Sequence, residues 1–210
     1  MSAHGEVDDG AVNDSEGHQD RVSYVPDDTK LSKGARLLSS IASQLDTEAF
    51  ERLVSFWLGK GTNLVLAGLL TEPCVKSVAS ELASLTDDPA SHELLSRRLF
   101  ENSAKTHVFS RMATFADYCD EVCQQNIRWE TLVIALVALG RASIDVPYYP
   151  PLYSLQAELE AFQKLVTGFA DTCLELVLSM GRMEDLLLIC QYENWILHSV
   201  IDGDQSKTVL

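Results

Sequence analysis

Residues 127–143 have apolar side chains on nearly every side of a helix, and this segment constrains the fold more than any other. Its longest near-continuous apolar run, residues 132–139, is followed by Gly140. A helix that is apolar all round must be covered by neighbours on most sides. The run is too short to span a bilayer, which needs about 20 residues. We therefore expect a central helix in a multi-helix domain, with Asn126 as its N-terminal cap.

The segments before residue 127 have the apolar spacing of amphipathic helices. Leu37, Leu38, Ile41 and Leu45 lie on one stripe of a first helix. Asp or Thr before such a segment, or Pro in the first turn, marks a helix start. These signals predict helices that begin at residues 46–47, 72–73 and 87–89, and the spacing predicts another at residues 111–123. The glycines at 59 and 61 are expected to end the second helix.

After the central helix, the Pro-rich segment 147–151 predicts a break. The pattern then predicts two long helices, at about 152–180 and 183–201, joined at Gly181. No segment shows the strict alternation of a β-strand, and no repeat of fixed period occurs. The predicted fold class is all-α, a multi-helix bundle over residues 31–210. Residues 1–30 hold eight acidic and two basic residues and few large apolar groups, which predicts a disordered acidic tail.

The formal net charge is -15, with an isoelectric point near 4.6. Phosphate contacts need clustered Lys and Arg, so this charge argues against direct nucleic-acid binding. It argues equally against an anionic membrane surface. The start of the chain lacks the basic and apolar regions of a secretory signal. The five cysteines have no tight spacing, which predicts reduced core thiols in a nuclear or cytosolic compartment.

Several short patterns superficially suggest metal or phosphate binding. Cys119 and Cys123 lie one helical turn apart, but a metal site usually needs a second such pair or histidine ligands. His92 and Glu93 begin like a zinc-protease helix, yet Ser96 stands where the second His is required. Residues 59–64 contain two glycines, a lysine and a threonine without the spacing of a phosphate loop. We expect no metal site and no cofactor.

The C-terminal region contains the best candidate polar cluster, formed by Glu193, His198, Asp202 and Asp204. His198 and Asp202 share a helix face, and a His–Asp pair can support general-base chemistry or hold a metal. No second histidine and no nucleophile lie nearby in sequence, so a structural role is favoured and no catalytic residue is predicted. The alternative is a small helical enzyme or ligand-binding protein, in which Glu193, His198 and Asp202 converge on a concave pocket.

Arg128 and Glu130 lie at the start of the central helix. Glu130 suits the positive end of the helix dipole. The two residues could instead form a buried pair that orients neighbouring helices. Either structural role is favoured over catalysis.

Three motif segments occur in one order along residues 45–206. The first runs from Phe56-Trp57-Leu58 to Pro73-Cys74-Val75, and the second is Asn-Ile-Arg-Trp-Glu-Thr-Leu at 126–132 with Leu-Gly-Arg-Ala-Ser at 139–143. The third is Gln-Tyr-Glu-Asn-Trp at 191–195 with Val-Ile-Asp-Gly-Asp-Gln-Ser at 200–206. Together they resemble the middle homology (regulatory) region of fungal zinc-cluster transcription factors.

The resemblance implies an all-α regulatory domain in the nucleus, associated with control of a metabolic or secondary-metabolite gene cluster. This chain lacks the family's N-terminal six-cysteine zinc cluster and the helices that follow its Gly-Asp-Gln-Ser segment. The resemblance therefore implies a truncated regulatory region that is not an enzyme and does not bind DNA itself. It would act by sensing a small ligand in its core or through a protein partner, either a full-length regulator or a second copy at an exposed apolar face. A helical adaptor protein is a further alternative.

Overall fold

The computed structural model describes residues 26–106 and 113–203, in which helices are joined by short loops. Within them no β-strand forms beyond one isolated bridge between Tyr149 and Tyr153. The prediction of an all-α multi-helix bundle is therefore confirmed. The helices are α1 (Asp28–Gln44), α2 (Thr47–Gly59), α3 (Gly68–Ser84), α4 (Pro89–Ser103), α5 (Phe115–Val122), the short 3-10 helix η1 (Gln124–Asn126), α6 (Trp129–Asp145), α7 (Gln156–Leu178) and α8 (Asp185–Ile201).

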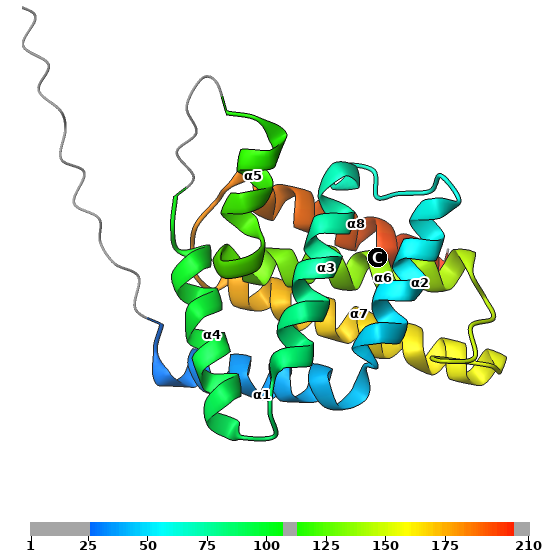
Figure 1. Ribbon diagram of the computed structural model, residues 1–210, viewed down its shortest axis with the longest axis horizontal. Coiled ribbons are helices and arrows are strands. Elements are labelled where there is room, and N and C mark those ends of the chain that lie inside the picture. Colours follow the sequence, from blue (N-terminus) through cyan, green and yellow to red (C-terminus); the bar gives the residue numbers. More distant parts are fainter. Residues whose placement is uncertain (1–25, 107–112, 204–210) are drawn as a thin grey trace, which may run out of the picture.

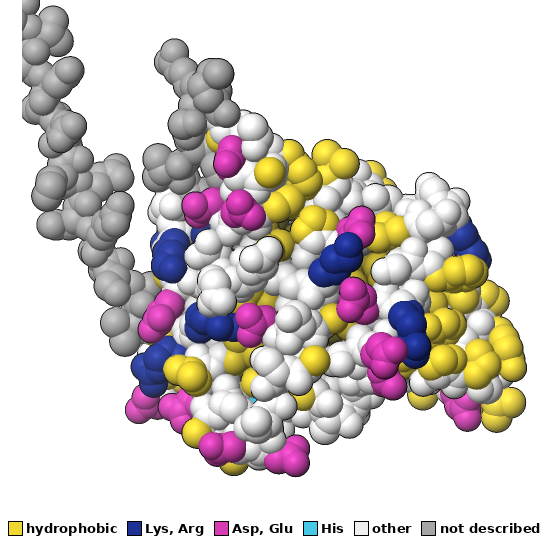
Figure 2. Space-filling model, viewed as in Figure 1, with side chains coloured by type: hydrophobic (Ala, Val, Ile, Leu, Met, Phe, Trp, Pro, Cys, Tyr) yellow, Lys and Arg dark blue, Asp and Glu magenta, His cyan; other side chains and the backbone are white. Residues whose placement is uncertain are grey.

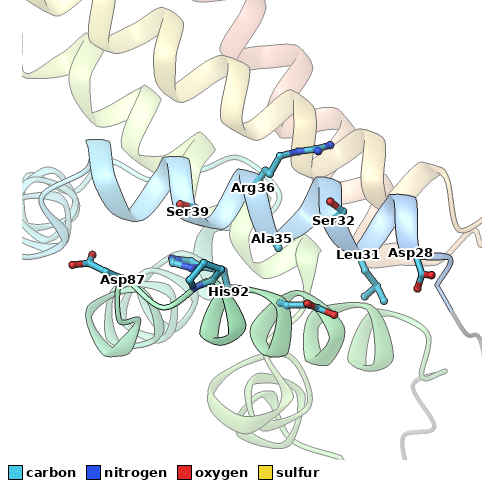
Figure 3. A pocket seen from close by; sticks show the side chains of 10 residues that line it. Asp28, Leu31, Ser32, Ala35, Arg36, Ser39, Asp87 and His92 are labelled. Atoms are coloured by element: carbon cyan, nitrogen blue, oxygen red, sulfur yellow. The ribbon is translucent and has the colours of Figure 1, made fainter.

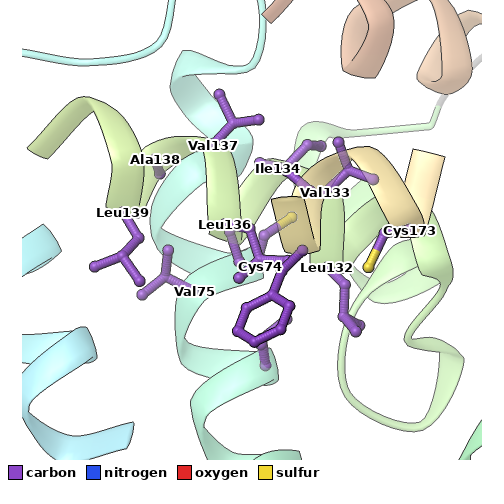
Figure 4. Close-up of a cluster of buried hydrophobic side chains, with 14 of the residues drawn as sticks. Cys74, Val75, Leu132, Val133, Ile134, Leu136, Val137, Ala138, Leu139 and Cys173 are labelled. Carbon is purple, nitrogen blue, oxygen red and sulfur yellow. The ribbon is translucent and has the colours of Figure 1, made fainter. Parts of the chain in front are cut away.

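Helix α6 lies at the centre of the bundle. In Figure 1, α6, α7 and α8 run roughly horizontally, and α2, α3 and α4 run upright in front of them. Helix α6 packs against α7, α3, α8, α2 and α4. Every residue from Trp129 to Gly140 is buried, and Figure 4 shows apolar side chains leaving α6 on several sides, among them toward α3 and α7. The predicted central position of this helix is confirmed.

Several helix ends follow the predicted signals. Asp46 Oδ1 accepts a hydrogen bond from the Ala49 N–H at 2.9 Å and so caps α2. Asp88 caps α4 in the same way, and Pro89 occupies the first helical position. Gly61 has a φ of 79° just after α2, a conformation that glycine adopts without steric cost. These local signals are strong because each satisfies a backbone group that a helix end leaves unpaired.

The first helix begins slightly earlier than its apolar pattern indicates. Helix α1 starts at Asp28, three residues before the predicted boundary at 31, and Asp27 Oδ1 accepts a hydrogen bond from the Lys30 N–H at 2.9 Å. The stripe predicted for this helix is buried. Residues 1–25, which make up most of the predicted tail, lie outside the described residues, as do residues 111 and 112 of the predicted 111–123 helix.

The predicted start of the third helix is wrong. Helix α3 begins at Gly68, and Pro73 lies inside it, where it can donate no hydrogen bond to the carbonyl of Leu69. The early start is stabilised from α8, because Glu193 Oε1 accepts hydrogen bonds from the N–H groups of Leu66 and Ala67 just before the helix. That carboxylate is distant in sequence, so local start signals do not reveal it.

The predicted cap of the central helix is also wrong. Asn126 belongs to η1, and its side-chain amide donates to the Asp120 carbonyl at 2.7 Å. Helix α6 instead begins at Trp129, whose N–H donates to Ser103 Oγ at 3.0 Å. The N–H of Arg128 donates to Thr131 Oγ1 at 3.1 Å. A serine from α4 therefore supplies the N-terminal acceptor that the sequence assigned to Asn126.

The last two helices are shorter than predicted. Helix α7 begins at Gln156 because Glu158 Oε2 accepts hydrogen bonds from the N–H groups of Ser154 and Leu155, at 2.7 and 3.1 Å. The break before it is confirmed, and the loop is anchored by Tyr153, whose hydroxyl donates to the Val146 carbonyl at 2.7 Å. Gly181, at the predicted junction, has a φ of 69°.

Two glycines set how closely helices approach each other. A Cβ atom on Gly34 of α1 would lie 2.8 Å from Trp129 Cζ2 and well inside contact distance of Ser96 Oγ on α4. A Cβ atom on Gly140 of α6 would lie 2.9 Å from both terminal methyl carbons of Leu197 on α8. The absence of a side chain therefore permits the close α1–α4 and α6–α8 packing.

Candidate functional site

The structure brings His198 and Asp202 together but places Glu193 in a different environment. His198 Nδ1 lies 3.0 Å from Asp202 Oδ2, and its Nε2 lies 2.9 Å from Asp171 Oδ1 on α7. Glu193 is five residues earlier, about 140° around the helix. Its side chain is 1% exposed and bonded to the backbone before α3. The three predicted side chains therefore do not converge on one pocket, and Asp204 lies outside the described residues.

The polar cluster around His198 joins α7 to α8. Asp171 accepts a further hydrogen bond from the Asn194 side-chain amide at 2.8 Å. Burial alone lowers the pKa of His198, but the hydrogen bonds and charges of Asp171 and Asp202 outweigh it and raise the pKa above its usual value. Asp171 was missed from the sequence, because its partner is 27 positions away and no local spacing links them. The geometry explains this cluster as an interhelical clamp.

Arg128 and Glu130 are both buried, and each binds a neighbouring segment. Arg128 Nη1 donates to the Lys105 carbonyl at 3.1 Å and lies 3.8 Å from Glu184 Oε2. Glu130 Oε2 accepts from Ser103 Oγ at 2.6 Å. Burial raises the pKa of Glu130, although the Ser103 hydrogen bond acts in the opposite direction. These contacts tie the start of α6 to the end of α4 and to the segment before α8, which is an orienting role.

The cysteines are free thiols, and all but Cys119 are buried. A hydrogen bond between the Cys74 and Cys123 side chains raises the pKa of Cys74 and lowers that of Cys123. Burial raises the pKa of Cys190 well above its usual value. Across residues 26–106 and 113–203, no three His, Cys, Asp or Glu side chains are grouped so that they could hold a metal ion.

The most distinctive surface feature is an apolar area on the outer side of α8, which we call the α8 face. Leu188, Tyr192 and Trp195 lie one turn apart along the helix and are exposed, and the rings of Tyr192 and Trp195 are 6.3 Å apart. Val200 extends the area along α8. We include in the face three exposed residues at and just before the start of α3, because Glu193 of α8 binds the backbone of this segment: Val65, Leu66 and Leu69.

The α8 face is large for the surface of a single chain. Trp195 is 63% exposed and Leu69 is 75% exposed. With roughly 200 Å² for a fully exposed large apolar residue, the seven residues expose about 800 Å². Among the exposed residues of α8, Asp185 alone is charged. Figure 2 shows hydrophobic side chains gathered over the start of α3, and a second group over the loop between α6 and α7.

An exposed apolar area of this size indicates a surface that binds another molecule. Apolar patches on monomers rarely exceed a few hundred Å², and larger ones mark interaction surfaces. A standard protein–protein interface buries about 800 Å² per partner. The summed exposure of the seven residues of the α8 face is of the same order as one side of such an interface.

The chain matches no protein-family model, no curated protein sequence and no solved structure. No helix in the described segments is long and apolar enough to cross a membrane.

Proposed function

We propose that this chain is a non-catalytic regulator of transcription that acts in the nucleus by binding another protein through the α8 face. The observation that carries the proposal is the size and low charge of that face. The resemblance of the three motif segments to fungal zinc-cluster regulators supports a role in transcription, in control of a metabolic or secondary-metabolite gene cluster.

The charge of the chain favours one kind of occupant for the α8 face. Each copy carries a formal charge of -15, so two copies repel each other, whereas a basic partner is attracted. The same charge disfavours direct contact with DNA phosphates. The proposed occupant is therefore an amphipathic helix of a basic protein, such as a DNA-binding regulator, laid along α8.

Trp195 provides a direct test of this occupant. The other two tryptophans, Trp57 and Trp129, are buried, so a partner that covers the α8 face changes the environment of Trp195 alone. A synthetic helical peptide with Leu on one face and Lys on the other is expected to give a saturable blue shift in tryptophan fluorescence. The matched Leu–Glu peptide is expected to give none, and Trp195→Phe is expected to remove the response.

Two results would contradict the proposed occupant. One is equal binding of the acidic and basic peptides. The other is a dimer of the chain alone, measured by sedimentation, that Leu188→Ser converts to monomer, because the face would then bind a second copy.

The regulatory role is tested by tethering. The full chain is fused to an unrelated DNA-binding domain, and the output of a reporter gene is measured in a eukaryotic host. Wild type is expected to change the output, and the double variant Leu188→Ser/Trp195→Ser is expected to abolish the change. Leu94→Ser, an exposed leucine on α4, is the matched control. Because these residues are exposed, the substitutions change stability by only about 0.5 kcal/mol each. An inert wild-type fusion, or equal effects of all variants, would refute the role.

A further inference from the structure

A groove between α1 and α4 is separate from the α8 face and has the features of a small-molecule site. Its volume is about 480 Å³, within the range of about 300–1,000 Å³ typical of ligand pockets. It runs along α1 from Asp28 to Ser39, a helical rise of about 16 Å. In Figure 3, Asp28 lies toward one end of the groove and Asp87 toward the other. The groove therefore suits an elongated ligand.

His92 is the residue that points to a ligand. Its side chain is 7% exposed, it lines the groove, and Figure 3 shows its ring directed toward α1. Neither ring nitrogen makes a hydrogen bond or ion pair with another described residue. Within residues 26–106 and 113–203, neither His92 nitrogen is among the fully buried polar atoms that lack a partner, so the ring nitrogens are accessible from the groove that the side chain lines. A ligand that carries an N–H or O–H group would satisfy an imidazole nitrogen here.

The charge and polarity of the lining select the ligand class. Three carboxylates line the groove: Asp28, Asp87 and Glu93. Asp28 and Asp87 form no ion pair with another described residue, whereas Glu93 lies 3.6 Å from Arg97 on its own helix.

The remaining residues that line the groove do not neutralise its three carboxylates. Arg36 also lines the groove, but its guanidinium extends away from α4 in Figure 3. The apolar part of the lining consists of Leu31, Ala35 and Pro89. Carboxylates along an elongated, partly apolar groove suit a chain of methylene groups with ammonium groups at its ends.

We propose that the α1–α4 groove binds a linear aliphatic polyamine, with its ammonium groups near Asp28 and Asp87 and an amine hydrogen-bonded to His92. The N-terminal segment of this chain is a poor occupant, because residues 1–25 carry six acidic residues and one basic residue. The site does not depend on the α8 face, so the two proposals can fail independently.

The test is titration calorimetry of the full chain with spermidine at low ionic strength. Wild type is expected to bind one equivalent, and uncharged 1,6-hexanediol is expected not to bind. Asp28→Asn/Asp87→Asn and His92→Phe are each expected to weaken binding by about tenfold or more, which corresponds to loss of about one charge-assisted contact. Ala35→Trp fills the groove without any change of charge and is expected to abolish binding. Circular dichroism verifies that each variant is folded.

An acidic protein can also attract polyamines without a site, so the control removes the same charge elsewhere. Glu101 and Asp120 are exposed and do not line the groove. Glu101→Gln/Asp120→Asn is expected to bind spermidine within about twofold of wild type. The proposal is overturned if wild type does not bind, if the control pair loses as much affinity as the groove pair, or if the folded Asp28→Asn/Asp87→Asn variant binds as wild type does.

Discussion

Replacement of Gly34 by alanine tests the close packing of α1 against α4 and the Trp129 ring. An added Cβ would lie 2.8 Å from the Cζ2 atom of Trp129 and closer still to Ser96 Oγ. Neither neighbour can move freely. The Trp129 ring is fully buried, and the Ser96 hydroxyl donates to the Leu31 carbonyl at 3.1 Å. The added methyl group must therefore push α1 and α4 apart.

The size of the effect follows from three terms. Overpacking of a core costs about 1–3 kcal/mol, and loss of the Ser96 hydrogen bond costs about 1 kcal/mol. Alanine stabilises a helix interior over glycine by about 0.5–1 kcal/mol. Gly34→Ala is thus expected to lower the free energy of unfolding by about 1–3 kcal/mol. Gly168→Ala in α7 is the matched control, because its Cβ meets no atom within 4 Å, and it is expected to raise that free energy by about 0.5–1 kcal/mol.

The assay is urea unfolding followed by far-ultraviolet circular dichroism, in which the midpoint reports stability at constant slope. The two alanine variants are expected to shift the midpoint in opposite directions. Ser96→Ala, which removes the nearest atom, is expected to be less harmful in the Gly34→Ala background than alone. If Gly34→Ala is as stable as Gly168→Ala, the close α1–α4 crossing is refuted.

Three further predictions concern buried or paired polar groups. Glu193→Ala is expected to lower the free energy of unfolding, measured in urea, by about 2–4 kcal/mol, because two backbone N–H groups lose a buried acceptor. An unchanged free energy of unfolding would refute the capping role of Glu193. The pKa of His198 is higher in the folded protein than its ordinary value of about 6.5. The pairing of His198 with Asp171 therefore stabilises the fold fully below about pH 6.5. This stabilisation is lost as the pH rises through the folded-state pKa. The wild-type midpoint should therefore fall more steeply than that of His198→Gln above about pH 6.5, and parallel profiles would contradict this reasoning. Burial raises the pKa of Glu130, so ionisation of this carboxyl destabilises the fold as the pH rises above the ordinary glutamate pKa. Glu130→Gln should therefore reduce the loss of stability between acid and neutral pH. An unchanged pH profile would argue against a desolvated carboxyl.

The all-helical class and most helix positions could be read from the sequence because their causes are local. The apolar period of α1, the Asp46 and Asp88 caps and the glycine at 61 each act within one helical turn. The central position of α6 was also predictable from its own residues, because a helix that is apolar on all sides must be covered by neighbouring helices. The structure confirms the predictions for these elements.

The errors arose where a distant side chain overrode a local signal. Pro73 suggested a helix start, but the carboxylate of Glu193 organises the turn before α3. Asn126 suggested a cap, but Ser103 of α4 accepts the first N–H of α6. In each case the partner lies far away in sequence, so spacing within a segment carries no information about it.

The candidate sites divide in the same way. The His198–Asp202 pair was predictable from its one-turn spacing. Its partner Asp171, the separate position of Glu193, and the groove between α1 and α4 were decided by how the helices pack. The sequence by itself determined the helices and their apolar stripes, because those depend on neighbours three or four residues apart. Only the tertiary structure decided which polar groups meet and which apolar side chains stay exposed, because those contacts join segments that the chain brings together only when it folds.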